Sequence, residues 1–110
     1  MKKPQKLWAD RTLEEKEQYW IDYSVNNRLS CSITRAKKQN KYPEWADKEE
    51  IRKFYVQAVL MEKETGISYD VDHIIPLNGE NVSGLHVHTN LQIVTRRENV
   101  KKRNKFTDDN

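Results

Sequence analysis

The sequence predicts one small α+β domain, in which two helices support a strand–strand–helix unit at the C-terminal end. Residues 12–66 carry apolar side chains at helical spacing, whereas residues 67–106 hold two β-rich stretches followed by a basic helix. The 110 residues suffice for a single domain, 1–110, with one modest core. Because 35% of the residues are hydrophobic and 34% are charged, we expect that core to be small and to consist largely of helix faces.

The N-terminal part is expected to be a short lead-in followed by a helix. Residues 1–11 have the composition of a loosely held basic segment, with Trp8 as its anchor. Thr12 starts a capping-box pattern, so we expect a helix to begin there and to extend as far as Ala36. The stretch 26–32 contains Asn and Ser residues, which are poor helix formers. A break or kink in this stretch is therefore an alternative to one long helix.

A second helix is predicted by its end signals and its apolar face. Asp47 and Glu50 form a capping pair at its start, and Gly66 is placed to end it in a left-handed conformation. Apolar residues recur every three or four positions between these ends, at Ile51, Phe54, Tyr55, Ala58 and Met61. The large aromatic residues that we assign to the core are Trp20, Trp45 and Phe54.

The C-terminal third is expected to form the strand–strand–helix unit. The first strand, Ser68–His73, alternates polar and apolar residues and ends shortly before a proline. The second strand, Leu85–Thr95, is rich in apolar and β-branched residues and is expected to run antiparallel to the first. Thr95 and Glu98 have capping-box spacing, so we expect a helix that carries Asn99 to begin directly after the second strand.

This unit would gather three polar side chains around one small site. The end of the first strand and the first turn of the helix can meet, which would bring Asp72, His73 and Asn99 together. Carboxylate and amide oxygens suit a magnesium-type ion that keeps several of its waters. An imidazole with an ordinary pKa of about 6.5 can accept a proton from water at neutral pH. These residues therefore predict metal-assisted hydrolysis.

The order of these residues resembles that of the HNH endonucleases, whose ββα-metal fold carries a His, an Asn and a final His or Asn. The matching residues are Asp72-His73, Asn90 in TNLQIV and Asn99 in ENVKK, which makes this an H-N-N version. About a third of the chain is similar to small free-standing HNH proteins of bacteriophages and to the HNH domain of RNA-guided CRISPR nucleases. The match is specific because several residue types must fall in order within one ββα unit.

The resemblance implies a role for each matching residue. His73 would be the general base that activates the attacking water, and Asn90 would brace the loop that holds this histidine. Asp72 and Asn99 would hold Mg²⁺ or Mn²⁺. The family also implies a DNA endonuclease that nicks or cuts double-stranded DNA and leaves 5′-phosphate and 3′-hydroxyl ends. The single cysteine, Cys31, excludes the paired-cysteine zinc knuckle of many HNH proteins, so no structural zinc is expected.

Basic residues accompany the predicted site. Six basic residues and one acid lie between positions 96 and 105, and a second basic run spans residues 35–41. Phosphate contacts from Lys and Arg supply most non-specific nucleic-acid affinity, so DNA is the expected partner. The residues expected to contact it are Arg97, Lys101, Lys102, Arg103, Lys37 and Lys38. The alternative is a solvated helix face, which is the usual explanation of a charge run.

Other interpretations stay open at this point. His86 and His88 alternate on the predicted second strand and could hold zinc, although they lack a cysteine partner. Asp70 shares a strand face with Asp72 and could also face the site. A non-catalytic DNA-binding or accessory HNH module, working with a phage protein partner or as a homodimer, would have the same basic helix. No stretch has the length and apolarity of a membrane span, so we expect a cytoplasmic protein, in the host cell if phage-encoded.

Overall fold

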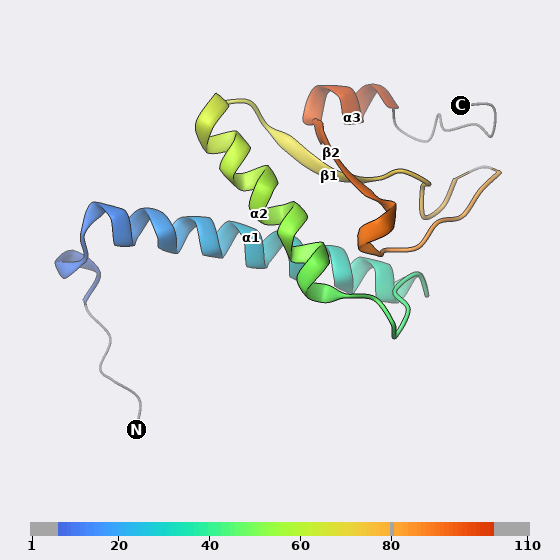
Figure 1. Cartoon of the computed structure of the whole chain (residues 1–110), viewed down its shortest axis with the longest axis horizontal. Helices are drawn as coiled ribbons and strands as arrows, with labels where there is room; N and C mark the ends of the chain where they lie inside the picture. Colours follow the sequence, from blue (N-terminus) through green and yellow to red (C-terminus); the bar gives the residue numbers. More distant parts are fainter. Residues whose placement is uncertain (1–6, 80, 103–110) are drawn as a thin grey trace.

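The computed structural model describes residues 7–79 and 81–102, and this part of the chain is α+β, as the sequence predicts (Figure 1). It contains three α-helices and one two-stranded antiparallel sheet. The bounds are α1 Leu13–Lys38, α2 Lys48–Thr65, β1 Tyr69–His73, β2 Leu91–Thr95 and α3 Arg96–Lys102. Two short 3-10 helices, η1 Trp8–Asp10 and η2 His88–Asn90, precede α1 and β2. None of the helices described is long and apolar enough to cross a membrane.

α1 is one unbroken helix, and its predicted capping box is formed. The backbone N–H of Glu15 donates to the Thr12 hydroxyl at 3.1 Å, and the N–H of Thr12 donates to the Glu15 carboxylate at 3.2 Å. The helix continues through the Asn- and Ser-rich stretch 26–32, so the alternative of a break is excluded. Packing outweighs low helix propensity here because buried residues recur every three or four positions. They are Val25, Leu29, Ile33 and Ala36.

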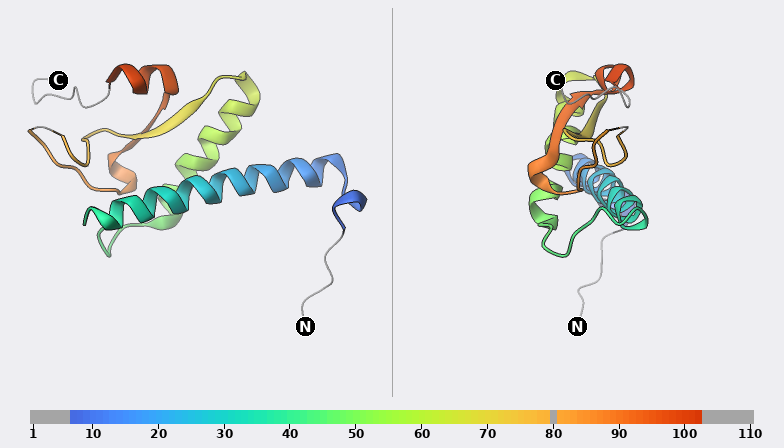
Figure 2. Two further views of the ribbon diagram at one scale, coloured as in Figure 1. Left: turned by 180° about the vertical axis from the view of Figure 1, so that it is seen from behind. Right: turned by 90° about the vertical axis from the view of Figure 1, so that its right-hand side faces the viewer.

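The predicted core is wrong at two of its three large aromatic residues. Trp20 is 57% exposed and Trp45 is 68% exposed, whereas Phe54 is partly buried and packs against the core. The core-facing side of α1 includes Ile21 and Val25. Successive residues of an α-helix are about 100° apart around its axis, so the neighbouring Trp20 points away from the core. The N-terminal half of α1 projects away from the sheet (Figure 2). Trp20, which lies in this half, packs edge-on against Trp8, at a ring-centroid distance of 6.0 Å.

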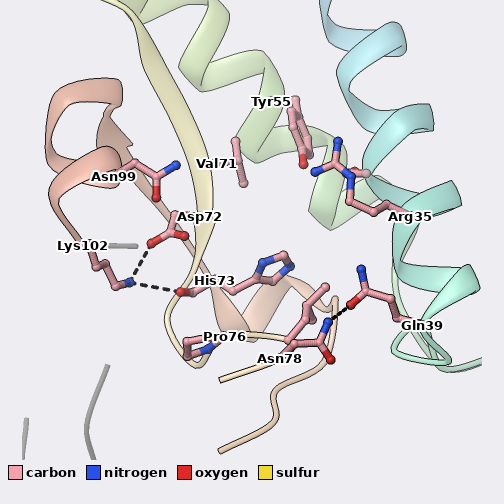
Figure 3. Close-up of a pocket in the computed structure, with 12 residues that line it drawn as sticks. Arg35, Gln39, Tyr55, Val71, Asp72, His73, Pro76, Asn78, Asn99 and Lys102 are labelled. Carbon is pink, nitrogen blue, oxygen red and sulfur yellow. Dashed lines mark hydrogen bonds and ion pairs between the residues drawn. The ribbon is translucent and has the colours of Figure 1, made fainter. Parts of the chain in front are cut away.

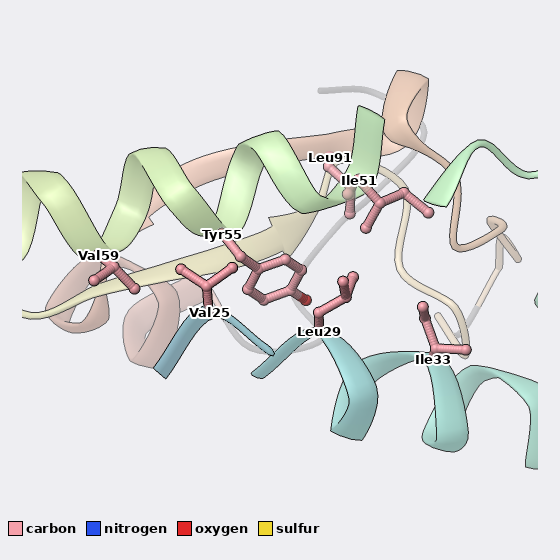
Figure 4. Close-up of a cluster of buried hydrophobic side chains, with 7 residues drawn as sticks. All are labelled: Val25, Leu29, Ile33, Ile51, Tyr55, Val59 and Leu91. Atoms are coloured by element: carbon pink, nitrogen blue, oxygen red, sulfur yellow. The ribbon is translucent and has the colours of Figure 1, made fainter. Parts of the chain in front are cut away.

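The core lies where α1, α2 and β2 meet (Figure 4). α2 contacts both α1 and the two strands, so it links the helical support to the sheet. The buried cluster consists of Val25, Leu29, Ile33, Ile51, Tyr55, Val59 and Leu91. Because Leu91 is the first residue of β2, the helical core also fixes where the sheet lies.

β1 and β2 pair antiparallel, with His73 opposite Leu91. β2 begins at Leu91 and not at Leu85 as predicted. β1 ends at His73, which leaves the segment before Leu91 without a strand to pair with. The backbone N–H of His86 donates instead to the carbonyl oxygen of Lys41, in the connection between α1 and α2, at 2.8 Å.

The predicted start and end of α2 and the predicted start of α3 are confirmed, although only half of the capping box of α3 is formed. The N–H of Glu50 donates to the Asp47 carboxylate at 3.2 Å, and Gly66 ends α2 with a φ of 74°. α3 follows β2 directly, because the N–H of Glu98 donates to the Thr95 hydroxyl at 3.1 Å. The Glu98 carboxylate accepts a hydrogen bond from that same hydroxyl at 2.8 Å.

Glu62 of α2 joins both helices to the first strand. Its two carboxylate oxygens accept hydrogen bonds from the Arg28 guanidinium of α1, at 2.7 and 3.2 Å. The same carboxylate accepts the backbone N–H of Tyr69, the first residue of β1, at 2.9 Å. Both side chains of the ion pair are partly buried, and bidentate Arg–carboxylate pairs are among the stronger polar contacts in proteins.

We predict that Glu62→Ala lowers the free energy of unfolding by about 1–3 kcal/mol, because it leaves Arg28 and the N–H of Tyr69 without their acceptor. Glu64→Ala, at an exposed position on the same helix, should change it by less than about 0.5 kcal/mol. Urea denaturation of the two variants measures the difference. Equal losses in both would show that this junction does not stabilise the fold.

Candidate active site

A pocket of about 340 Å³ opens between α1, the end of β1 and α3 (Figure 3). Asp72 and His73 of β1 and Asn99 of α3 all line it, so the structure brings together the three residues predicted to form the site. Arg35 of α1 and Gln39, the residue that follows α1, lie across the pocket from Asp72 and Asn99. The site therefore lies at the junction between the helical support and the strand–strand–helix unit.

Asp70 orients the side chain of Asn99. Residues two apart on a strand share a face, and both Asp70 and Asp72 interact with side chains of α3. Asn99 Nδ2 donates to Asp70 Oδ2 at 3.0 Å. Because an ionised carboxylate can only accept, the amide nitrogen must face Asp70, and the amide oxygen of Asn99 remains for another ligand. Asp70, considered above as a residue that could face the site, thus acts on it through Asn99.

The side chain of Lys102 points into the site instead of outward into solvent. Its ammonium donates to Asp72 Oδ2 at 2.6 Å and to the carbonyl oxygen of His73 at 3.1 Å. Gln92 Nε2 donates to the same carboxylate oxygen at 3.3 Å. The other oxygen, Asp72 Oδ1, has no hydrogen bond to any residue that the structure describes, so it remains for a further ligand.

The remaining oxygen atoms suit Mg²⁺ or Mn²⁺. Asp72 offers a carboxylate oxygen and Asn99 an amide oxygen, and both side chains line the same pocket. Hard divalent ions such as Mg²⁺ often take only one or two protein oxygens and complete their shell with water and substrate phosphate. The residues present therefore fit the ion that the resemblance implies.

His73 is hydrogen-bonded to a second imidazole. Its Nε2 lies 2.8 Å from Nδ1 of His86, which is only 1% exposed. Burial lowers the pKa of His73, and Lys102 and Arg35 act in the same direction, although Asp72 opposes them. Burial also lowers the pKa of His86 to about 4, with smaller contributions from His73 and Arg35. At pH 7 both rings are therefore neutral, and His73 has a lone pair that can accept a proton.

The partnership of His86 with His73 was missed in the sequence. His86 and His88 do not alternate along a strand as predicted, because the segment before Leu91 is a loop followed by η2. The shared strand face on which a zinc pair would depend is therefore not formed. The apolar neighbours Leu85 and Val87 could have indicated that His86 is buried, but no local pattern identifies the ring it meets.

Asn90 ties together the two ends of the loop that follows His73. Its Nδ2 donates to the carbonyl oxygens of Ile75 and Leu85, at 3.0 and 2.9 Å, and its Oδ1 accepts the N–H of Ile75 at 2.8 Å. A side chain at Gly84 would come within 2.3 Å of the Ile75 carbonyl oxygen and 2.7 Å of Asn90 Nδ2, so only glycine fits there. These bonds have the geometry expected of the predicted loop brace.

The basic residues predicted to contact DNA differ in where they lie in the structure. Arg97 and Lys101 of α3 are exposed, as are Lys37 and Lys38 at the end of α1. Arg103 lies outside the described residues. Arg35 was predicted only as part of a basic run, yet it lines the pocket and has no hydrogen bond or ion pair with any described residue. The cations that line the pocket are therefore Arg35 of α1 and Lys102 of α3, whereas Arg97 and Lys101 lie outside it.

Comparison with protein-family models, with curated proteins and with solved structures finds no match to this chain. A function must therefore be argued from the site itself, which combines a carboxylate, an amide, a neutral imidazole pair and nearby cations.

We predict that the protein loses stability in mild acid through His86. The ordinary pKa of 6.5 applies in the unfolded chain and the folded pKa is about 4, so the unfolded chain binds the proton more tightly. The contribution is fully present above about pH 6.5 and is lost as the pH falls towards about 4. Between about pH 7 and pH 5 it amounts to roughly 2 kcal/mol.

Urea denaturation at several pH values, on the parent protein and on His86→Leu, measures this contribution. The parent should lose more stability than the variant over the same pH interval, because the variant cannot take up that proton. Parallel pH dependences would contradict the assignment of the loss to His86.

Proposed function

We propose that this protein is a divalent-metal-dependent endonuclease of the HNH type that hydrolyses phosphodiester bonds in DNA. The observation that carries the proposal is the convergence of Asp72, His73 and Asn99 on one pocket. They supply a carboxylate oxygen, a neutral imidazole and an amide oxygen, which suit metal-assisted phosphodiester hydrolysis. The H-N-N order of His73, Asn90 and Asn99, which resembles the HNH family, supports the same reaction.

In the proposed reaction, His73 acts as the general base. His86 occupies its Nε2, so Nδ1 is the ring nitrogen left to take a proton from the attacking water. Asp72 and Asn99 would hold Mg²⁺ or Mn²⁺, which supplies stabilisation of negative charge on the phosphoryl and leaving oxygens. Asn90 acts indirectly, because its hydrogen bonds to Ile75 hold the backbone just after His73 in place.

Cations around the pocket support DNA as the substrate. Arg35 of α1 and Lys102 of α3 line the pocket, whereas Arg97 and Lys101 are exposed on another side of α3. A nucleic-acid backbone that crosses the pocket between these helices would meet positive charge from both sides, and such contacts supply most of the sequence-independent affinity for DNA. By the family resemblance, the products would be 5′-phosphate and 3′-hydroxyl ends on double-stranded DNA.

One contact favours a second candidate, a non-catalytic or accessory DNA-binding module. The Lys102 ammonium lies 2.6 Å from Asp72 Oδ2, where it neutralises the carboxylate that would otherwise attract a cation. A protein in which this ion pair persists would bind DNA with the same basic residues but would not cleave it. Metal-dependent cleavage by the purified protein separates the two candidates.

We predict that the purified protein nicks or linearises supercoiled plasmid with Mg²⁺ or Mn²⁺ and that a chelator stops it. His73→Ala should slow cleavage by about 10²- to 10⁴-fold, the usual range for loss of a general base, and should leave DNA binding intact. Asp72→Ala and Asn99→Ala should also abolish most cleavage, with partial rescue at high metal concentration.

His88→Ala is the matched histidine control, because this ring does not line the pocket. Thermal melting of each variant separates loss of chemistry from loss of folding. A folded His73→Ala protein that cuts plasmid at the parental rate would refute the mechanism, and a parent that binds DNA but never cuts it would favour the accessory module.

We further predict that exposed cations of α3 contact phosphates. Replacing Arg97 and Lys101 with Gln should weaken binding to all duplex sequences alike and reduce the log–log salt slope by roughly 0.9 per lost contact. The control replaces Lys48 and Lys53 of α2 with Gln, which changes the net charge equally at exposed positions on a different helix. If the two double variants have the same slope, α3 contributes only general positive charge.

A further inference from the structure

We infer that His86 is a positioning residue, which orients the His73 ring and keeps the proton on His73 Nε2 so that Nδ1 faces the pocket unprotonated. The inference deepens the proposed function and rests on it for its consequence in catalysis. The hydrogen bond and proton position can be tested in the free protein without DNA or metal. Nothing in the H-N-N pattern assigns His86 a role.

The contact itself is specific in geometry. The two ring nitrogens lie 2.8 Å apart, and the rings meet edge to face, with centroids 5.1 Å apart and an angle of 63° between their planes. Among the described residues, this is the only hydrogen bond that the His73 side chain makes. Rotation of the His73 ring would break this bond inside the protein, so the bond selects one ring orientation.

The position of the shared proton decides whether His73 can act as a base. Two neutral imidazoles joined by one N–H···N bond have two possible arrangements. If His86 Nδ1 carries the proton, then His73 must carry its own proton on Nδ1, and the nitrogen left for the pocket cannot take another. If His73 Nε2 carries it, His73 Nδ1 has a free lone pair. The proposed chemistry requires the second arrangement.

His86 is itself held firmly. Its backbone N–H donates to the carbonyl oxygen of Lys41 at 2.8 Å, and its ring lies against Tyr42, with centroids 6.0 Å apart. The carbonyl of the preceding residue, Leu85, accepts a hydrogen bond from Asn90 at 2.9 Å. His86 therefore ties His73 to the connection between α1 and α2, which is part of the helical support.

Packing alone does not explain a histidine at this position. The second nitrogen of His86, Nε2, is buried and has no hydrogen-bond partner among the described residues. An apolar side chain of similar size would fill the same space without burying an unpaired polar atom. The feature that an apolar residue could not reproduce is the bond from Nδ1 to His73.

The experiment uses two substitutions of similar size, together with nitrogen NMR of isotope-labelled histidine in the free protein at neutral pH. His86→Asn keeps an acceptor at the position of Nδ1, because the amide oxygen is attached to the same carbon, whereas His86→Leu removes it. The parent should show coupling across the hydrogen bond, with the proton on His73 Nε2. His86→Asn should keep that protonation pattern, and His86→Leu should give a mixture of the two His73 tautomers.

In plasmid cleavage, His86→Leu should lower kcat by roughly 10- to 100-fold, the range for losing a group that orients a site histidine, with little change in KM. His86→Asn should restore most of that loss. If His86 has only a structural role, the kcat of each variant should instead fall in step with its melting temperature. His86→Asn would then give no rescue.

Three results would overturn the inference: a proton found on His86 Nδ1 in the parent, an unchanged His73 tautomer in His86→Leu, or equal kcat in the two variants. If neither variant folds, the NMR measurement on the parent still decides the proton position. A parent that shows the expected proton position but never cleaves DNA would refute the proposed function while leaving the pairing of the two histidines intact.

Discussion

The geometry of the candidate site follows from a single register between β1 and β2. Leu91 is 5% exposed in the helical core and stands opposite His73 in the sheet. Side chains alternate along a strand, so a slip of one residue would exchange the faces of Asp72 and His73. With Leu91 packed into the core that α1 and α2 share, the carboxylate of Asp72 faces α3 and the imidazole of His73 faces His86. The helical support therefore acts on the site through this buried leucine, together with the Glu62–Tyr69 and Lys41–His86 hydrogen bonds.

Around this register, paired charges lie next to imidazoles that stay neutral. Lys102 pairs with Asp72 and Arg96 pairs with Asp70, so the two carboxylates of β1 are not left uncompensated. Burial lowers the pKa of both His73 and His86, which disfavours two positive rings side by side. The buried Nε2 of His86 nevertheless has no partner among the described residues, and such an atom costs about 1–3 kcal/mol. Departures of this kind from ideal packing are expected where a residue serves a site more than the core.

Predictions from the sequence were correct where a structural feature depends on residues that are close together in the chain. Capping by Thr12, the left-handed end at Gly66 and the strand-to-helix turn at Thr95 each depend on groups within a few residues of one another. Burial of Trp20 was predicted wrongly, because a helix with aromatic residues on more than one side does not show which side its neighbour will cover. The start of β2 was also wrong, because a strand needs a partner and β1 ends at His73.

The chemical groups available to the site can be read from the order of amino acids, since an Asp-His pair at a strand end and an amide at Asn99 are properties of residue type and spacing. The bracing role of Asn90 was expected only from the family resemblance. Three-dimensional packing was needed to show that His86 meets His73, that Lys102 pairs with Asp72 and that Arg35 reaches the pocket from α1. The first two contacts join residues 13 and 30 positions apart in the chain. Such contacts depend on how α2 positions the sheet relative to α1. That arrangement is decided by the shape of a shared core, which no short stretch of sequence encodes.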